Sequence, residues 1–446
     1  MRRSERRRLI ARALALSLVL AAPGRAALAQ TFPVETFTLP NGLKALLQPD
    51  PTVPSLCLGV VFHAGSKNER PGITGISHFF EHMMFNGSAK YAPKQFDHIL
   101  EGGGGYSQGF TTEDFTLYYE EFNPDLLPKA LDMEADRMRA LKIDDENLEQ
   151  ERGVVKEERR LRVDNSPRSK MYEQLKAVAY TAHPYSWPVI GWMSDIDHIA
   201  LADCKAYFHT YYAPDNAVLC LTGDFIPAKA RPLIEAAFGD IPAHEPPPPV
   251  TTVEEPQLGE RRLVVRIPAE QPAVVAAYHM VGRRDPDYLA YDLLSNVLGA
   301  GESSRLHQAL VYDAQVASSV QAFVDGNEHP GLLYIWADVS PGKTPDAVLA
   351  GIDSVVAKFA AEGAAPAEVD KARNQTQTAL VGQLTTNENR TISLLRSAVL
   401  DGDYRRVFTI MGEYDKVTAD DVTRVGRACL TPENRSVAVL LPEDES

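Results

Sequence analysis

Residues 72–87 read Gly-Ile-Thr-Gly-Ile-Ser-His-Phe-Phe-Glu-His-Met-Met-Phe-Asn-Gly, and this stretch holds two histidines and a carboxylate within five positions. His78 and His82 are four residues apart, so on a helix they lie on one face, a single turn from each other. Glu81 lies between them on the same side. A catalytic zinc requires neutral nitrogen ligands on a rigid element and a base close enough to take a proton from water. The stretch therefore predicts one arm of a zinc site.

A second interpretation of this stretch needs no metal. Large apolar residues surround the two histidines and would form a buried helix by themselves: Phe79, Phe80, Met83, Met84 and Phe85. Residue frequencies give roughly one chance occurrence of His-x-x-Glu-His in fifty chains of this length. The zinc interpretation therefore depends on a third ligand elsewhere in the chain.

The third ligand is expected on a second helix, which the periodicity of residues 144–163 predicts. A zinc held by two histidines normally takes one more protein ligand and keeps its fourth position for water. Glu151 and Glu158 are seven residues apart and share one helix face, whereas Glu157 points about a quarter of a turn away. The face that carries Glu151 and Glu158 is therefore the candidate source of the ligand.

The two motifs together resemble the pitrilysin/insulinase family of zinc peptidases, in which an inverted His-x-x-Glu-His is followed about seventy-five residues later by Glu-Arg-x-Val-Val-x-x-Glu. Here the second motif spans residues 151–158. Further landmarks cover nearly the whole chain beyond residue 29, among them Gly72-x-x-Gly75, Phe110-Thr-Thr-Glu-Asp114, His183-Pro-Tyr, Ile190-Gly-Trp, Gly223-Asp224 and Ser304-Arg-Leu. Within the family, the chain is most similar to the short bacterial members and to mitochondrial processing peptidase subunits.

The resemblance implies an α+β fold built from two tandem homologous LuxS/MPP-like domains, each an antiparallel sheet packed with helices. It also implies one Zn²⁺ per chain, with His78, His82 and Glu158 as its ligands. The resemblance also implies that Glu151 supports activity without binding the metal, as a residue outside the set of direct ligands. Glu81 is the expected general base, which takes a proton from the zinc-bound water and passes it to the leaving nitrogen.

The family also binds its substrate as an extra strand on an edge of the sheet, a mode that reads the peptide backbone. The resemblance places this contact at Gln108, Gly109 and Phe110. Relatives usually have Asn-Ala where this chain has Gln108-Gly109, so the chain departs from the family pattern at this point.

Active members use an Arg and a Tyr from the second half to bind the substrate backbone and stabilise the oxyanion. Matching the family pattern from Ser304-Arg-Leu onward puts Val311 at the Arg position and Ser318 at the Tyr position, and neither side chain can do this. Arg305 and Tyr312 have the family's spacing of seven, which leaves a shifted register open.

We therefore expect a zinc-dependent endopeptidase or oligopeptidase subunit that hydrolyses peptides or unfolded segments in an enclosed chamber. The expected partner is a homologous chain that supplies the Arg/Tyr pair in a heterodimer. Two alternatives stay open: a self-sufficient homodimeric zinc peptidase, and a non-catalytic scaffold subunit of the same fold. The complete ligand set with Glu81 argues against the scaffold, because a subunit without catalysis has no need for a base beside a metal.

Residues 1–29 have the organisation of a secretory signal peptide, with a basic start, an apolar run over residues 9–22 and a small-residue cleavage site near Ala29. The ordinary export route is favoured over a twin-arginine route, and we expect a periplasmic or secreted protein without a stable membrane anchor. Cleavage removes seven Arg and one Glu, which changes the formal net charge from −15 to −21. This charge excludes nucleic acid as an expected partner.

The rest of the chain is too long for one hydrophobic core. We expect an N-terminal zinc-binding peptidase domain over residues 30–241, a Pro-rich acidic linker over residues 242–260, and an inactive-type domain of the same fold over residues 261–446. The order strand, loop, helix recurs in the second domain, which indicates a duplication, but residues 285–296 lack the histidines. One long helical stretch is predicted from Pro366 to Asp401.

Four scattered cysteines form no Cys-x-x-Cys pair, and they suit neither a disulfide framework nor a zinc–thiolate site. Cys57 and Cys220 lie in apolar runs and are interpreted as small core residues.

Overall fold

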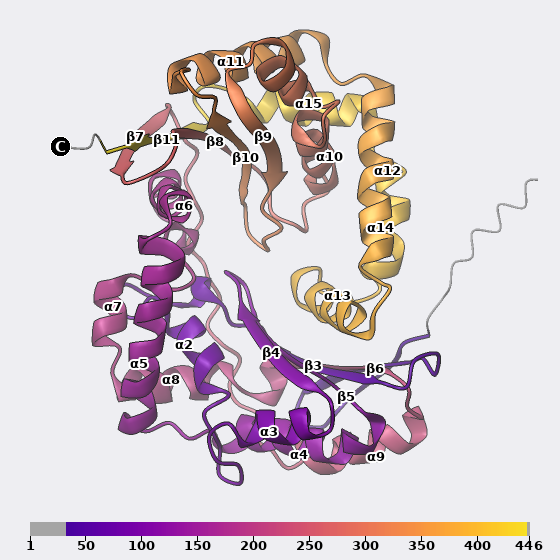
Figure 1. Cartoon of the computed structure of the whole chain (residues 1–446). Helices are drawn as coiled ribbons and strands as arrows, with labels where there is room; N and C mark the ends of the chain where they lie inside the picture. Colours follow the sequence, from indigo (N-terminus) through magenta and orange to yellow (C-terminus); the bar gives the residue numbers. More distant parts are fainter. Residues whose placement is uncertain (1–32, 444–446) are drawn as a thin grey trace, which may run out of the picture. The chain divides into compact units, whose positions relative to one another are not determined.

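The computed structural model describes residues 33–443, and residues 34–443 belong to one structural unit. The signal peptide predicted over residues 1–29 lies outside the described residues. Two sheets, each with its own helices, divide this unit into a first half (residues 34–241) and a second half (residues 261–443) (Figure 1). Residues 242–260 between the halves contain no helix or strand.

The first half begins with a hairpin whose turn contains Pro40-Asn-Gly42, where Gly42 has a φ of 92° that favours glycine. Its strands are β1 (Glu35–Thr38), β2 (Lys44–Pro49), β3 (Leu56–Phe62), β4 (Tyr106–Thr111), β5 (Thr116–Phe122) and β6 (Ala217–Gly223). Its longer helices are α2 (Ile76–Met83), α3 (Gln95–Gly102), α4 (Leu127–Ala140), α5 (Asp145–Arg159), α6 (Pro167–Ala179), α7 (Met193–His198), α8 (Leu201–Tyr211) and α9 (Pro227–Phe238), with a π-helical turn η3 (Arg160–Asp164) directly after α5.

The second half repeats this plan with fewer elements around its sheet. Its strands are β7 (Arg261–Ile267), β8 (Ala273–His279), β9 (Ala317–Val324), β10 (Leu332–Val339) and β11 (Arg435–Pro442). Its helices are α10 (Tyr288–Gly299), the π-helical η6 (His307–Asp313), α11 (Pro345–Glu362), α12 (Pro366–Gly382), α13 (Asn387–Leu400), α14 (Arg406–Tyr414) and α15 (Ala419–Cys429).

The two sheets share one topology. The first has the strand order β1-β2-β6-β3-β5-β4 and the second the order β7-β11-β8-β10-β9, so every strand of the second sheet has a counterpart in the first. The predicted pair of homologous α+β domains is confirmed. The sheets are not purely antiparallel, however, because β2 pairs with β6 and β7 pairs with β11 in parallel. The two strands of each parallel pair are joined by a long segment that contains the other strands and several helices, in keeping with the long connection that parallel neighbours require.

Each half also lends one helix to the sheet of the other half. Helix α6 packs on β7 and β11, where Leu175 is buried in one cluster with Val275. Helix α13 packs on β3 and β6, where Leu395 is buried in one cluster with Val61. A Cβ atom on Gly59 of β3 would lie 2.8 Å from Cδ1 of Leu395, so the glycine makes room for α13. The two halves are therefore interlocked by an exchange of helices.

The helical stretch predicted from Pro366 to Asp401 is two helices. The chain leaves the helix after Gln383, and Thr386 starts α13 by accepting a hydrogen bond from the backbone N–H of Asn389. Strand β9 and helices α6, α7, α9 and α14 have no counterpart in the sequence prediction. The side chains of β9 are mostly exposed or half-buried, so this edge strand shows no apolar alternation.

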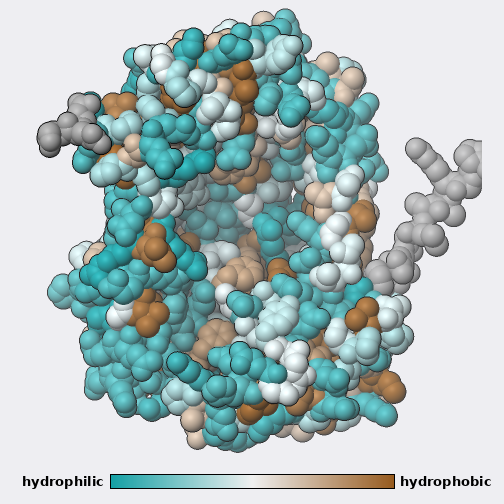
Figure 2. Space-filling view, viewed as in Figure 1, coloured by the Kyte–Doolittle hydropathy of each residue, from teal (hydrophilic) through white to brown (hydrophobic). Residues whose placement is uncertain are grey.

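All four cysteines are buried free thiols, and Cys57 and Cys220 lie in β3 and β6 as core residues. Within residues 33–443, no helix combines the length and the apolar character needed to cross a bilayer. The face seen in Figure 2 is mainly hydrophilic and has only scattered hydrophobic residues.

Candidate metal centre

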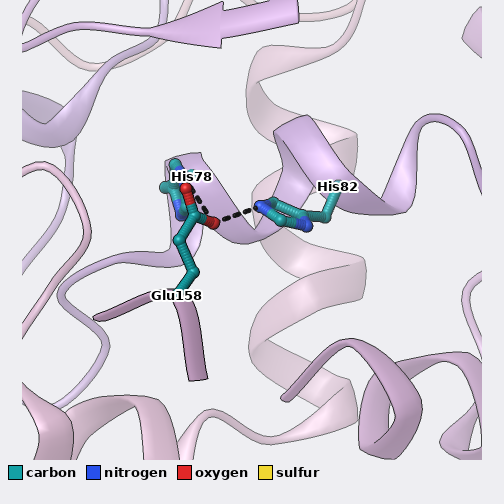
Figure 3. A group of neighbouring side chains, drawn as sticks. All are labelled: His78, His82 and Glu158. Carbon is teal, nitrogen blue, oxygen red and sulfur yellow. Dashed lines mark hydrogen bonds and ion pairs between the residues drawn. The ribbon is translucent and has the colours of Figure 1, made fainter. Parts of the chain in front are cut away.

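Helices α2 and α5 bring His78, His82 and Glu158 together (Figure 3). The Oε2 atom of Glu158 lies 3.0 Å from Nε2 of His82 and 3.7 Å from Nε2 of His78. One donor atom from each residue lies within 4.8 Å of the others, and this is the one such group in the described part of the chain. His78 is buried, and the other two residues are half-buried.

This donor set fits zinc. Ligand bonds of about 2.0–2.2 Å in a tetrahedron place neighbouring donor atoms about 3.3–3.5 Å apart. The two separations from Oε2 of Glu158, 3.0 and 3.7 Å, lie on either side of that value. Two imidazole nitrogens with one carboxylate oxygen are also donor types of catalytic zinc sites, which keep one position open. The residues present can therefore hold the metal with little rearrangement.

Two further carboxylates flank the ligands. Glu151 is buried, and its Oε2 atom lies 3.3 Å from Nδ1 of His82. A hydrogen on Nδ1 leaves Nε2 of the same ring free to bind a metal. Glu81 lies with Oε2 4.0 Å from Nε2 of His78 and accepts a 2.7 Å hydrogen bond from the hydroxyl of Thr111 on β4. Both carboxylates thus lie where the sequence prediction needs them.

The two histidines differ in their protonation. Burial and the neighbouring His82 lower the pKa of His78 to about 4, so its ring is a neutral donor at pH 7. Burial opposes a charge on His82 as well, but hydrogen bonds to Glu151 and Glu158 raise its pKa to about 9. Burial also raises the pKa of Glu81. A carboxyl group with increased proton affinity suits a general base.

The start of α2 is held by two carboxylates that the sequence did not single out. The N-cap residue Gly75 has no side chain to cap the helix, and Glu69 accepts hydrogen bonds of 2.8 Å from the backbone N–H groups of Gly75 and Ser77. Asp195 accepts a 3.2 Å hydrogen bond from the backbone N–H of Thr74. Both side chains accept hydrogen bonds from backbone N–H groups at the helix start, so these contacts stabilise the helix that carries both histidines.

A close backbone crossing then sets α2 against α5. Gly75 and Gly191 have φ values of 91° and 81°, and a Cβ atom on Gly191 would lie 2.2 Å from the carbonyl oxygen of Thr74. Arg159 of α5 donates a 2.6 Å hydrogen bond to the carbonyl oxygen of Gly191. The two glycine landmarks of the sequence therefore meet at one point, next to the residue that follows Glu158.

Thr111 and Arg162 are site neighbours that the sequence prediction missed. Thr111 follows the predicted substrate strand, and its spacing of two from Gly109 was the available signal for a side chain on the same face. The Nε atom of Arg162 lies 3.0 Å from Oε1 of Glu158, which leaves Oε2 to face the histidines. Arg162 follows Glu158 by four residues, so the i,i+4 spacing of ion pairs on a helix was the available signal, although the residue lies in the π-helical η3.

The predicted substrate residues lie beside the candidate metal ligands. Strand β4 is the outer strand of the first sheet, and Gln108, Gly109 and Phe110 lie on it. Two cavities of about 870 and 410 Å³ share Glu81, His82, Gln108 and Gly109 in their walls. A Cβ atom on Gly109 would lie 3.4 Å from Cγ of Glu81, so the glycine keeps this space open. An outer strand offers unpaired N–H and C=O groups to an added peptide strand.

The walls of these two cavities contain first-half residues alone. Arg305 donates hydrogen bonds of 2.8 and 2.6 Å to the two carboxylate oxygens of Glu368, and another of 2.7 Å to the carbonyl oxygen of Gly363. Tyr312 is 71 % exposed. These contacts give Arg305 a structural role in the second half and argue against the shifted register.

Two family models match the chain. The model for insulinase, peptidase family M16, matches residues 44–191, and the model for the peptidase M16 inactive domain matches residues 198–376. The chain therefore belongs to the insulinase family of peptidases, and the family resemblance seen in the sequence is confirmed.

The relatives point in the same direction. The chain is 29 % identical over 412 residues to the zinc protease PqqE of Helicobacter pylori, with 92 % of this chain and 93 % of that protein covered. It is 26 % identical over 419 residues to the mitochondrial-processing peptidase subunit beta of Lentinula edodes, with 91 % and 89 % covered. The crystal structure of a protease from Helicobacter pylori matches with a TM-score of 0.87 at 28 % identity and covers 92 % of this chain and 99 % of that one. These similarities support a peptidase and imply zinc.

Proposed function

We propose that this chain is the zinc-bearing subunit of an endopeptidase or oligopeptidase that hydrolyses peptides or unfolded segments in an enclosed chamber. The observation that carries the proposal is the convergence of His78, His82 and Glu158, with Glu81 beside them and the outer strand β4 along the same cavities. The similarity to proteins named zinc proteases supports the same chemistry. The face shown in Figure 2 is hollowed at its centre, which suits a substrate held inside rather than on an outer surface.

The chain's own residues account for the proton transfers. When zinc is bound, it acts as a Lewis acid that lowers the pKa of water and polarises a carbonyl group. Glu81 takes one proton from the attacking water and gives it to the leaving nitrogen, so one peptide bond and one water yield a carboxylic acid and an amine. The hydroxyl of Thr111 orients the Glu81 carboxylate. Backbone pairing with β4 holds the peptide extended beside this carboxylate.

A second chain is expected to complete the site. The oxyanion needs a donor, and the walls of the two cavities in the described structure contain no residue of the second half. Arg305 is bound to Glu368 and is therefore not available for this task. A homologous chain with the Arg/Tyr pair would supply the donors in a heterodimer. One relative is itself named as a subunit of a processing peptidase, which supports a paired arrangement.

The Glu81→Gln variant tests the role of the base. It keeps the three zinc ligands, so zinc bound per chain should stay unchanged while peptide hydrolysis falls by about 10²–10⁴-fold. The matched control is Glu146→Gln on α5, whose side chain is 85 % exposed, and it should keep full activity. Unchanged hydrolysis by the Glu81→Gln protein would refute the assignment.

Adding a homologous chain from the same organism to the purified protein tests the heterodimer. Peptide hydrolysis should appear or rise strongly with the partner, and full activity of the isolated chain would contradict the dependence. We place the mature protein in the periplasm or outside the cell because of the signal-type residues 1–29. Sequencing the N-terminus of the exported protein tests this, with cleavage expected near Ala29.

A further inference from the structure

The second half contains a cavity of about 740 Å³ at the place that corresponds to the metal centre. In the first half, the cavities are walled by α2, by the outer strand β4 and by α5. In the second half, the walls are α10, the outer strand β9 and α12, joined by α13 and α14 (Figure 1). The duplicated fold has therefore kept this pocket in the half that lacks the metal ligands.

The lining follows the same helix periodicity in both halves. Helix α5 and the following η3 line their cavity with residues about one turn apart, which are Gln150, Gly153, Val154, Glu157 and Glu158 of α5 and Leu161 of η3. Helix α12 does the same with Gln375, Thr376, Ala379, Leu380 and Gln383. Strand β9 exposes Ala322, Phe323 and Val324 to the cavity, as β4 exposes Gln108, Gly109 and Phe110. The two cavities thus have the same position in their halves and the same kind of outer-strand wall, but the side chains that line them differ in chemistry.

The second-half cavity differs from the first-half cavities in having the cationic side chain of Arg396, from α13, in its wall. Its side chain lines the cavity and makes no hydrogen bond or ion pair with any residue of the described chain. A Cβ atom on Gly326 would lie 2.7 Å from Nη2 of Arg396, so the glycine leaves the space that the guanidinium occupies. Arg396 is exposed to solvent; desolvation and the nearby Arg283 lower its pKa, the charges of Asp401 and Asp114 oppose this, and an arginine keeps its charge at neutral pH.

The carboxylates of this cavity already have partners. Asp401 accepts hydrogen bonds from Arg283 at 2.8 Å and from Arg406 at 2.7 Å. Asp292 accepts a 2.7 Å hydrogen bond from the hydroxyl of Tyr414. The charges of Asp401 and Asp114 act on Arg396, but in the described chain neither carboxylate forms a hydrogen bond or ion pair with its guanidinium, which is therefore open to a ligand at the cavity wall. Such a group binds an anionic ligand, and a carboxylate matches the two parallel donors of a guanidinium.

We propose that this cavity is a second peptide-binding site, in which a peptide lies along β9 and its C-terminal carboxylate pairs with Arg396. The peptide nature of the ligand rests on the proposed peptidase function, whereas the carboxylate preference rests on Arg396 alone. A peptide bound here is a substrate end or a cleavage product, held by the half of the chain that has no metal ligands.

Two forms of one peptide test the proposal. The protein carries Glu81→Gln, and the probes are N-acetyl-Ala-Val-Phe with a free C-terminal carboxylate and the same peptide with a C-terminal amide. Titration calorimetry should show the carboxylate form binding about tenfold or more tightly than the amide, as expected for a charge-assisted bidentate pair. Adding Arg396→Gln should abolish this preference. Any binding at the metal is common to both proteins, so the difference between them reports the second cavity.

Controls keep the test decisive. Arg405→Gln changes an exposed arginine of the same region and should keep the preference for the carboxylate. Gly326→Ala should weaken the preference, because the added methyl group displaces the guanidinium. Arg396→Gln breaks no hydrogen bond or ion pair of the described chain, so its thermal melting should be unchanged. Equal affinity for the two peptides, or a preference that survives Arg396→Gln, overturns the proposal. Mass spectrometry of the titrated peptide shows separately whether Glu81→Gln still cleaves, which tests the proposed function.

Discussion

The two halves of the molecule are built on one sheet topology and hold a cavity at the same place, but they differ in the side chains around that cavity. In the first half, a helix, an outer strand and a second helix surround two histidines and three glutamates. In the second half, the corresponding elements surround a cavity with Arg396 and no metal-ligand group among the described residues. The fold thus supplies the position of a site, and a few side chains decide its chemistry.

The two halves also depend on each other for their cores. Helix α6 covers the second sheet and α13 covers the first, so each core contains side chains from the other half. Because α6 follows α5 through η3, the helix with Glu158 continues into the element that joins the halves. The candidate metal centre therefore depends on the second half for its framework, although none of its three candidate ligands comes from that half.

The largest expected effect is on zinc content, which should respond to a substitution in the first-half cavity and not to one in the second-half cavity. His82→Ala removes one of three ligands, so zinc per chain after dialysis should fall from one to near zero, and peptide hydrolysis should be lost. Asn296→Ala makes the matched change on α10 in the second cavity and should leave the zinc content at one. Elemental analysis of both proteins checks this. Zinc retained by His82→Ala would show that the metal binds elsewhere.

The next effect tests the exchange of helices. Leu395 is fully buried against the first sheet, so Leu395→Ala should lower the free energy of unfolding by about 2–5 kcal/mol. Val381→Ala in the same half changes a side chain that is 53 % exposed and should cost less than about 0.5 kcal/mol. Urea unfolding measures both. Hydrogen exchange should show lost protection in β3 and β6, and loss confined to the second half would contradict the exchange.

A smaller effect concerns the residue behind His82. Glu151→Gln keeps the shape of the side chain and removes the charge that orients the His82 ring, so zinc affinity should fall by about 10–100-fold. Competition with a chelator of known affinity measures it. Glu157→Gln, one residue before the ligand Glu158 with a 72 % exposed side chain, should change the affinity less than about twofold. Equal effects of the two changes would mean that Glu151 acts only through net charge.

The smallest effect concerns the linker between the halves. Glu254 accepts hydrogen bonds of 2.8, 2.8 and 2.9 Å from the backbone N–H groups of Thr181, Ala182 and His183, directly after α6. These contacts hold the pKa of Glu254 below its ordinary value of 4.5, despite partial burial. A lowered pKa in the folded state stabilises the fold above pH 4.5, and this contribution is lost as the pH falls through the folded-state pKa.

Glu254→Gln should therefore destabilise the protein at pH 7 and lose its effect in acid. Thermal melting of both proteins at several pH values checks this, and the two melting temperatures should converge below pH 4.5. The matched change Glu255→Gln, on an exposed neighbour, should give no such pH dependence. A constant difference at all pH values would show that Glu254 acts without its charge.

Much of the site was predictable because its signals are local. The spacing of His78 and His82 and the seven residues between Glu151 and Glu158 each describe one face of one helix, and a helix presents such faces in any surroundings. The duplication was visible for the same reason, since strand and helix patterns recur along the chain. The break in the stretch from Pro366 to Asp401 was not predicted, because the helix-starting role of Thr386 depends on where the chain turns.

Helical spacing and strand patterns could not predict the contacts between segments that are distant in the sequence. Glu69 caps α2 from a loop and Asp195 from helix α7, and Thr111 reaches Glu81 from a strand. Which sheet α6 or α13 covers is likewise a matter of complementary apolar faces far apart in the chain. Apolar burial is non-directional, so an amphipathic helix does not specify its partner by sequence alone.

The sequence by itself determined the donor types, their helical spacing, the duplication and the family. Only the tertiary structure decided that Oε2 of Glu158 faces both histidines, that β4 is an outer strand beside them, and that Arg305 is bound to Glu368. It also decided that Arg396 faces a cavity without a partner. The physical reason is the distance in sequence over which each signal acts. Helical periodicity determines only the direction in which a side chain points from its own helix. Whether candidate ligands from two helices meet, or whether a charged side chain finds a partner, depends on how separate elements pack.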